Sequence, residues 1–284
     1  MKIKSSSLTK RNIQKFLDNK MAVVGAVVLI VMVLCCVFAP LITQYAPERI
    51  DTKNKLSGIS SRHILGTDRL GRDIFSRILY GGRYSIFIGL ASAVGRSRVG
   101  VIFGCIAGYL GGRADKILVS VSEFFSVFPQ TLLILLCMGF MGQSMVNIIL
   151  IFIITGWSGV FRIVRTRILS LKQEPFVESC VAIGISGRSI MFKQLLPNTI
   201  GPVIVHTTLA TAGYILAEAG LSFLGMGVPA KIPTWGNIIN AAKRLDIIIN
   251  SPLLWAAPGG AISLFVLSIN FLGDGLRDVF DTKN

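Results

Sequence analysis

Four long stretches of this 284-residue chain contain no Asp, Glu, Lys or Arg, and they limit what the chain can fold into. A helix needs about 20 apolar residues to cross the hydrocarbon core of a bilayer. The second stretch has 38 residues, enough for two crossings separated by a break at 139–144. With a less apolar segment at 84–111, the sequence predicts an all-α polytopic membrane protein with six transmembrane helices. The charge-free stretches are residues 21–47, 124–161, 194–217 and 247–273.

The composition favours the same class of protein. Hydrophobic residues make up 52% of the chain and charged residues only 15%, and the mean hydropathy of +0.67 is far from that of a soluble domain. The first apolar stretch is too long for a signal peptide and lacks a small-x-small cleavage site before its charged exit. We therefore expect it to be a permanent anchor.

The net charge of +15 raises the question of an anionic partner. The cations are spread over several loops, without a basic helix or an aromatic platform between them, so anionic lipid headgroups explain them better than nucleic acid does. The five cysteines form no C-x-x-C pair, and His63 and His206 lie on different segments without ligand spacing. We expect no metal site and no cofactor in this chain.

The distribution of Lys and Arg predicts the orientation in the membrane. With the N-terminus in the cytosol, the inner segments hold 16 Lys and Arg and the outer segments hold 11, over 68 residues on each side. This excess agrees with the positive-inside rule. Both termini and residues 162–193 are then cytosolic, whereas residues 43–83 and 227–253 lie outside.

A polar segment about thirty residues long interrupts the apolar sequence after Lys172. Pro175 can start a short helix and Gly184 can end it in a left-handed cap; a second helix is expected to begin near Ser186 and to stop at Pro197. Apolar residues recur at spacings of three and four, so each helix is expected to carry one apolar face suited to a groove on another protein. These residues are Phe176, Val177, Cys180 and Val181, then Ile190, Met191 and Leu195.

This segment resembles the EAA coupling loop of ABC importer permeases, whose pattern is Glu-Ala-Ala, then Gly, then His-x-Leu-Pro-Asn. In that family the loop docks into a cytoplasmic ATPase subunit. Gln194 replaces the family histidine, while Ser179 and Cys180 are small replacements for the two alanines. The resemblance implies a coupling loop at 170–197 with Glu178, Ser179, Cys180, Gly184, Leu196, Pro197 and Asn198 as ATPase-coupling residues.

A second signature lies in the expected outer segment. Residues 65–77 read LGTDRLGRDIFSR, and GGRYS follows at 81–85. On chemistry alone this is a solvated stretch in which Asp68, Arg69, Arg72, Asp73 and Arg77 pair locally. The pattern also resembles the C-type permease subunit of dipeptide, oligopeptide and nickel importers. Further similarities are found at 108–115, 217–225, 233–237 and 270–278, so the resemblance covers about residues 60–281.

Arg96 and Arg98 interrupt the expected second span, where the family is apolar. Counted from Tyr84 at 1.5 Å per residue, Arg96 lies about 18 Å deep, where a lone cation costs about 2.5 to 3.5 kcal/mol. One alternative is that at least one arginine lines the translocation path and attracts a substrate carboxylate. The other is a pair with Glu123 or with a neighbouring subunit. Glu218, near the outer boundary, is expected to form a structural hydrogen bond.

The sequence also excludes an ATP site of the P-loop type, because no glycine is followed by lysine. Enzymatic activity is therefore not expected, and ATP with Mg²⁺ would bind to partner ATPase subunits. An ion-coupled secondary transporter would need acidic groups or histidines in a midplane relay. Neither a secondary transporter nor a channel or scaffold needs a cytosolic docking loop, so the loop argues against these classes.

The resemblance implies a type I ABC importer permease in the bacterial cytoplasmic membrane, for oligopeptides or dipeptides or, alternatively, for nickel or a metal chelate. Its expected partners are a homologous permease, two cytoplasmic ATPases, an extracytoplasmic binding protein and membrane lipid. We divide the chain into a tail, first helix and outer segment at 1–83, a five-helix core at 84–276 and a cytosolic tail at 277–284. The substrate, the role of Arg96 and Arg98, the resting conformation and the identity of the two ATPases stay open.

Overall fold

The computed structural model describes residues 3–280, with side chains from residue 11 onward, and in this part of the chain every regular element is a helix. The α-helices before the middle of the chain are α1 (Ile3–Asp18), α2 (Lys20–Val37), α3 (Ala39–Ile42), α4 (Ile74–Leu110), α5 (Gly112–Val127), α6 (Gln130–Met141), α7 (Met145–Gly156) and α8 (Ser158–Leu171). They are followed by α9 (Pro175–Ala182), α10 (Gly187–Ile190), the π-helix η1 (Met191–Leu195), the 3-10 helix η2 (Pro197–Thr199), α11 (Ile200–Phe223), α12 (Trp235–Ala241), α13 (Leu245–Asn250) and α14 (Leu253–Phe280).

Five helices are long and apolar enough to cross a membrane: α2, α4, the continuous segment Met145–Leu171, the segment Gly187–Phe223 that includes α11, and α14. A sixth crossing exists only if α5 and α6 count together, because they are bent by 91° at the break between them. The all-α polytopic fold is thus confirmed, with five or six spans.

The bend between α5 and α6 lies within the first of the two crossings expected in residues 124–161. Pro129 lacks a backbone N–H and disfavours a helical conformation for the residue before it. Phe128 accordingly adopts φ −84° and ψ 138°. The 12 residues of α6 extend only about 18 Å, too short to cross the hydrocarbon core alone. The expected break between this segment and the next is present, because α6 ends at Met141 and Gly142 follows with φ +78°.

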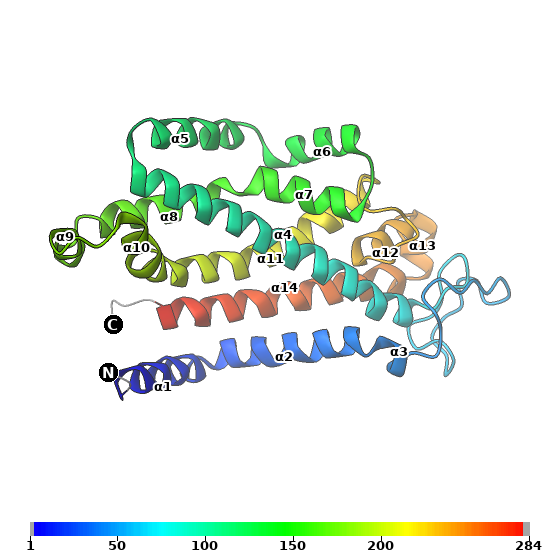
Figure 1. Ribbon diagram of the computed structural model, residues 1–284. Coiled ribbons are helices and arrows are strands. Elements are labelled where there is room, and N and C mark those ends of the chain that lie inside the picture. Colours follow the sequence, from blue (N-terminus) through cyan, green and yellow to red (C-terminus); the bar gives the residue numbers. More distant parts are fainter. Residues whose placement is uncertain (1–2, 281–284) are drawn as a thin grey trace.

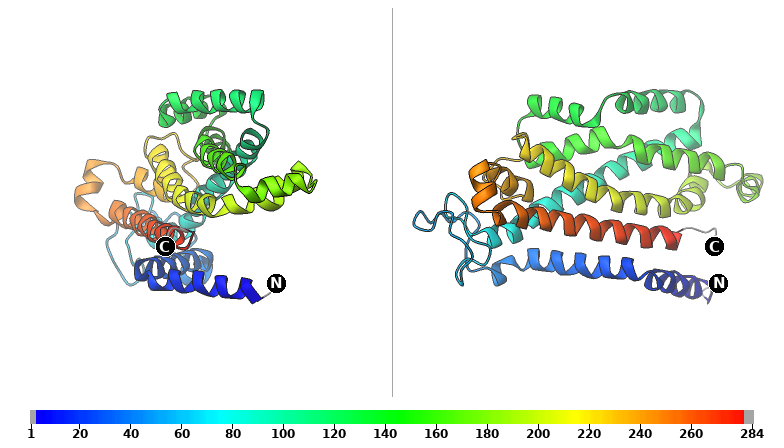
Figure 2. Two further views of the ribbon diagram at one scale, coloured as in Figure 1. Left: turned by 90° about the vertical axis from the view of Figure 1, so that its left-hand side faces the viewer. Right: turned by 180° about the vertical axis from the view of Figure 1, so that it is seen from behind.

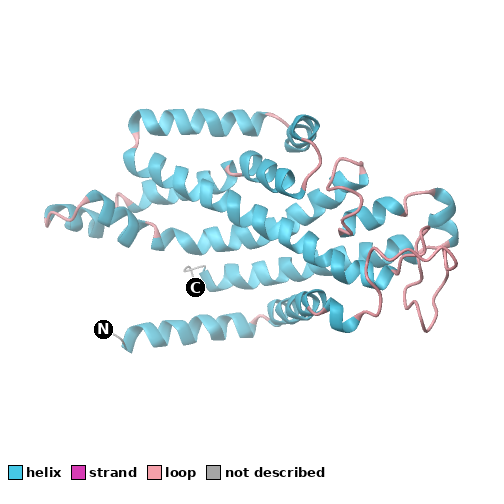
Figure 3. Cartoon of the chain, turned by 45° about the vertical axis from the view of Figure 1, so that its right-hand side comes forward, coloured by secondary structure: helices cyan, strands magenta, loops and turns pink. Residues whose placement is uncertain are grey.

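The long helices lie side by side in a row that runs from α2 through α14 and α11 to α7 and α8, with α5 and α6 along the far edge (Figure 1). Helix α4 crosses this row and packs against α8, α11 and α7. Helices α1, α9 and α10 lie at one end of the bundle, as does the end of α14, and Figure 2 shows the same grouping from behind. The loops between α3 and α4, with α12 and α13, lie at the opposite end (Figure 3).

Helix α4 has 37 residues and begins at Ile74, ten residues before the expected start of the second span. It packs against α8 through three glycines spaced four residues apart. Gly100 lies against Val160, Gly104 against Val164, and Gly108 against Ile168, all on α8. Small residues at this spacing let two membrane helices approach closely.

The LGTDRLGRD segment folds back onto the first turn of α4. Asp73 caps the helix by accepting a hydrogen bond from Ser76 N at 2.7 Å, and its other oxygen lies 2.9 Å from Nδ1 of the buried His63. Asp68 forms an ion pair with Arg72 at 2.6 Å, as local pairing predicted. Arg77 instead donates to the carbonyl of Pro47. The motif therefore builds the start of α4.

Candidate functional site

The polar segment between α8 and α11 forms the outermost structure at the end of the bundle that also holds α1 (Figure 1). As predicted, α9 begins at Pro175 and Gly184 follows it with φ +77°. The backbone N–H groups of Gly184 and Ile185 donate to the carbonyls of Val181 and Cys180, which closes the end of the helix. Ser186 precedes α10 in an extended conformation, so the second helix also begins where the sequence predicted.

The expected stop at Pro197 is wrong, because the helical backbone continues from Gly187 to Phe223. Proline has no N–H to donate to the carbonyl four residues earlier, and its ring needs room there. The chain meets both demands with a π-turn, in which Leu196 N donates to Met191 O at 2.8 Å. The Asn198 amide then donates to the carbonyl of Gln194 at 2.6 Å. Leu196, Pro197 and Asn198 thus form a helix junction.

The expected apolar faces of these helices are divided between the chain's own core and the surface. Val177, Ile190 and Leu195 are buried against the spans, next to Val164 and Ile168 of α8. The large apolar side chains that remain exposed are Phe176, Val181, Ile183 and Phe192. The exposed set therefore keeps Phe176 and Val181 from the predicted faces and adds Ile183 and Phe192.

The other residues expected to take part in coupling lie on α9. Glu178 lies in the first turn of α9, where a negative charge interacts favourably with the helix dipole. Ser179 is exposed and donates to the carbonyl of Pro175, while Cys180 is half-buried. Among the residues that the structure describes, no hydrogen bond or ion pair is found for the Glu178 carboxylate. This carboxylate is free to meet a group on another chain.

The segment rests directly on the end of α4. Lys172 donates to the carbonyl of Tyr109 at 3.0 Å, and its Nζ lies 5.4 Å from the centre of the Tyr109 ring. Gly187 faces the Tyr109 hydroxyl, which a Cβ at that position would meet at 2.5 Å. A displacement of the segment would therefore act on α4 as well as on α8 and α11.

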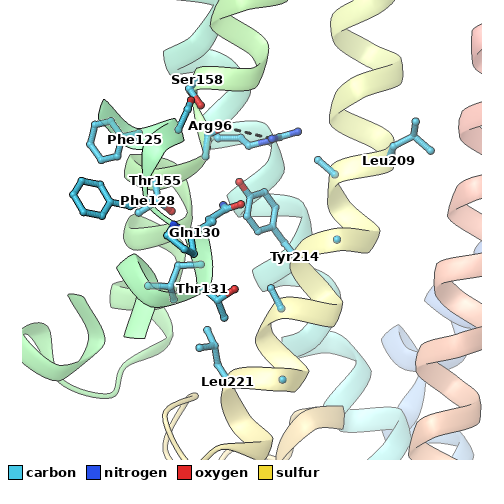
Figure 4. Close-up of a pocket in the computed structure, with 18 of the residues that line it drawn as sticks. Arg96, Phe125, Phe128, Gln130, Thr131, Thr155, Ser158, Leu209, Tyr214 and Leu221 are labelled. Atoms are coloured by element: carbon cyan, nitrogen blue, oxygen red, sulfur yellow. Dashed lines mark hydrogen bonds between the residues drawn. The ribbon is translucent and has the colours of Figure 1, made fainter. Parts of the chain in front are cut away.

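A second candidate site is a cavity of about 1120 Å³ between the α5–α6 bend, the α7–α8 junction and α11 (Figure 4). Its polar lining includes Arg96, Gln130, Thr131, Ser158, Arg162 and His206. Along α11 the lining includes four small residues, Ala210, Gly213, Ala217 and Gly220, beside larger ones such as Leu209 and Tyr214. A Cβ placed on Gly213 or Gly220 would meet no atom within 4 Å.

Arg96 is 8% exposed, and its guanidinium contacts only uncharged groups. It donates to the carbonyl of Gly156 at 3.4 Å, to Nδ1 of His206 at 2.8 Å and to the carbonyl of His206 at 3.3 Å. It also lies 5.4 Å from the centre of the Tyr214 ring. Figure 4 shows the Arg96 side chain reaching toward α11, beside Tyr214. The expected pair with Glu123 is not formed, because Glu123 lies exposed on α5.

Arg98 does not join Arg96 in the cavity. The helix is regular through both positions, so the two side chains point about 200° apart, and Arg98 is exposed on the outside of the bundle. The sequence did not indicate His206, Tyr214 or Gln130 as site residues. His206 lies 110 positions from Arg96, and only the crossing of α4 and α11 brings them together.

Glu218 is fully buried in α11 and has the structural role that the sequence predicted. Its Oε1 atom accepts hydrogen bonds from Ser222 at 2.7 Å and from Thr234 at 2.8 Å. These bonds tie α11 to the start of α12. Glu218 does not line the cavity.

Comparisons with known proteins agree with this geometry. Residues 100–284 match the family model of the binding-protein-dependent transport system inner membrane component. Residues 7–58 match the model of the N-terminal transmembrane domain of oligopeptide transport permease C.

Individual relatives span almost the whole chain. The oligopeptide transport system permease protein OppC of Bacillus subtilis is 38% identical over 280 residues, which cover 99% of this chain and 91% of the relative. The dipeptide transport system permease protein DppC of the same organism is 37% identical over 281 residues, which cover 98% and 87%. OppC of Haemophilus influenzae is 36% identical over 291 residues, which cover 100% and 91%. The chain therefore belongs to the family of inner membrane components of binding-protein-dependent transport systems, as a C-type permease of the peptide ABC importers.

Proposed function

We propose that this permease carries oligopeptides or dipeptides across the bacterial cytoplasmic membrane, driven by ATP hydrolysis on partner subunits. The observation that carries the proposal is that residues 175–199, the expected docking segment, continue without a helical break after Gly187 into α11, which lines the polar cavity. We call residues 175–199 the docking segment. The relatives that match almost the entire chain are named oligopeptide and dipeptide permeases, which favours a peptide over nickel or a metal chelate.

The partners follow from what the chain contains. No glycine precedes a lysine, so phosphate binding of the P-loop type has to come from separate ATPase subunits with their own ATP and Mg²⁺. We infer that Glu178 and the exposed apolar residues of the docking segment contact one of these subunits. A homologous permease would cover the open side of the cavity, and an extracytoplasmic binding protein would deliver the substrate at the opposite end.

The proposed function implies one orientation of the permease in the membrane. The docking segment has to face the cytosol, and α1 and the end of α14 lie at the same end of the bundle (Figure 2). Both termini are then cytosolic, and the loop at 43–73 lies outside. We retain the division at residues 83 and 276 as a proposal about function, although α4 itself begins at Ile74.

The docking role can be tested with one apolar side chain that the fold itself does not use. Ile183 is 74% exposed, so Ile183→Asp should leave the bundle intact and remove an apolar contact with the ATPase. Leu245→Asp is the matched control, because Leu245 is 76% exposed at the opposite end of the bundle. Both complexes would be purified and assayed for ATPase retention, peptide uptake and peptide-stimulated ATP hydrolysis.

We expect Ile183→Asp to lower uptake and stimulation at least tenfold, equivalent to about 1.4 kcal/mol of lost coupling or binding energy, and Leu245→Asp to preserve ATPase retention and stimulation. Gly184→Pro should have the same effect as Ile183→Asp. Its φ of +77° is closed to proline, and no atom lies within 4 Å of the position to add a packing clash. Full ATPase stimulation in an assembled Ile183→Asp complex would refute the docking surface.

A further inference from the structure

The cavity beside α11 has an unbalanced charge. Its lining contains two arginines, Arg96 and Arg162, together with His206, and no aspartate or glutamate. Arg162 lies at the rim and donates to the hydroxyl of Ser126 at 3.0 Å. Arg96 lies deeper, and each of its hydrogen-bond partners is a neutral group.

Arg96 also keeps unused hydrogen-bonding capacity. Its Nε atom is buried and has no hydrogen-bond partner among the described residues. A guanidinium presents five N–H donors in a fixed planar fork. The contacts with Gly156 and His206 fix the orientation of this fork, and they leave Nε and part of Nη1 without an acceptor.

A buried cation without a counter-charge is costly in a membrane, and such residues face water-filled cavities or functional sites. The ligand that best completes a guanidinium is a carboxylate, which accepts two parallel hydrogen bonds from the fork. Polar side chains that can form hydrogen bonds with the rest of a peptide are nearby, since Gln130, Thr131 and Ser158 line the same cavity. The volume of about 1120 Å³ lies just above the range of about 300 to 1,000 Å³ that is usual for small-molecule sites.

We propose that Arg96, held in place by His206 and the carbonyl of Gly156, binds a carboxylate of the peptide as the peptide passes through the cavity. The site would give the permease its own preference for anionic groups, in addition to the selection made by the binding protein. This inference rests on the proposed function as a peptide importer. The carboxylate can belong to the peptide C-terminus or to an acidic side chain, because the chemistry is the same.

The test compares peptides that differ only in the carboxylate. The complete complex with its binding protein would be reconstituted in vesicles and supplied with Ala-Ala-Ala, its C-terminal amide, or Ala-Glu-Ala amide, which restores a carboxylate in a side chain. The affinity of the binding protein for each peptide would be measured separately. Uptake would then be compared at saturation, so that a difference reports on the permease.

The variants separate charge from hydrogen bonding. Arg96→Gln keeps a donor for Gly156 and His206 but removes the charge, and Arg96→Lys keeps the charge. The matched control is Arg98→Gln, on the same helix but outside the cavity. We expect the parent, Arg96→Lys and Arg98→Gln to carry the two carboxylate peptides about tenfold faster than the amide. Arg96→Gln should carry all three at similar, low rates.

Each other outcome counts against the site. If Arg96→Gln retains the parent preference, or lowers the uptake of all peptides by the same factor, then Arg96 does not bind the carboxylate. Failure of both Arg96 variants to assemble would show that Arg96 pairs with a partner subunit or holds the fold. If the parent complex imports none of the peptides, the proposed function fails too. A parent that imports all three at one rate refutes this inference alone.

Discussion

Three glycines of α4 determine how closely this helix packs on α8, and replacing the middle one tests that arrangement directly. In Gly104→Ala the new Cβ would lie 2.7 Å from Val164 Cβ, 2.9 Å from Val164 Cγ1 and 3.0 Å from the carbonyl oxygen of Phe161. Ordinary contacts between carbon atoms are about 3.5 to 4.0 Å long. The added methyl group therefore overlaps its neighbours by about 1 Å.

Local rearrangement cannot relieve this overlap. One of the three atoms belongs to the backbone of α8, and the other two lie at or next to the branch point of a buried valine. The helices have to separate, and separation also loosens the contacts at Gly100 and Gly108, one turn away on either side. Overpacking of this kind costs about 1 to 3 kcal/mol. We expect Gly104→Ala to lower the free energy of unfolding by that amount, and Gly104→Leu to prevent assembly.

The assay is denaturant unfolding of the purified permease in detergent, followed by tryptophan fluorescence. Gly139→Ala is the matched control, because this glycine is also helical and a Cβ there would meet nothing within 4 Å. The double variant Gly104→Ala with Val164→Ala removes the valine methyl groups that face the new one. It should recover part of the lost stability.

Two results would refute the reasoning about α4 and α8. One is a Gly104→Ala protein with the stability of the parent, which would mean that the helices are farther apart than described. The other is an equal loss in Gly104→Ala and Gly139→Ala, which would point to a general effect of alanine rather than to this interface.

Two further predictions concern orientation and the buried carboxyl of α11. A cysteine at Lys55 should react with a membrane-impermeant thiol reagent in intact cells, while one at Lys172 should react only after lysis; labelling of Lys172 from outside would reverse the proposed topology. Glu218→Leu should lower the unfolding free energy by about 1 to 3 kcal/mol, because the hydroxyls of Ser222 and Thr234 lose their acceptor. Glu218→Gln retains an acceptor oxygen and should cost less, and equal losses in the two variants would show that the hydrogen bonds are not the cause.

In the docking segment, the start and the end of α9 could be predicted from the sequence, because they depend on local backbone chemistry. Pro175 and Gly184 act within their own turns, through a missing N–H and a positive φ, so their positions alone predict where α9 begins and ends. The same holds for the charge-free stretches, whose length and hydropathy predict spans independently of their neighbours. These signals do not depend on contacts with distant parts of the chain.

Pro197 shows where local rules fail. A proline inside a helix ends it only if the backbone cannot accommodate the ring, and here a π-turn and the Asn198 side chain accommodate it. Which apolar residues face the core was also not predictable. Val177 and Val181 have the same chemistry and lie four residues apart, yet the position of α8 makes the first buried and the second exposed.

The role of Arg96 depended on contacts that the sequence could not reveal. The sequence indicated a costly cation and two alternatives, one of which was a pair with Glu123 or with a neighbouring subunit. The structure places that carboxylate on the outside of α5 and supplies neutral acceptors from α11 and from the α7–α8 junction instead. Spacing along one helix did separate the two arginines correctly, because a rotation of about 200° holds wherever the helix is regular.

The two helices that support the docking segment also supply the hydrogen-bond acceptors for Arg96. Helix α11 carries His206 seven residues beyond Thr199, about 10 Å away. The continuous span Met145–Leu171, which α7 and α8 form together, carries Gly156 twelve residues before Ile168, about 18 Å away. Arg96 itself belongs to α4, which contacts the segment at Tyr109. Under the proposed function, a pull by the ATPase on the docking segment shifts α8 and α11 relative to α4. Such a shift changes the distances between the Arg96 fork and its acceptors, and thus how firmly the fork is held for a carboxylate. Binding in the cavity and ATP hydrolysis would in that case be coupled through rigid helices, with no need for a separate mobile element between the two sites.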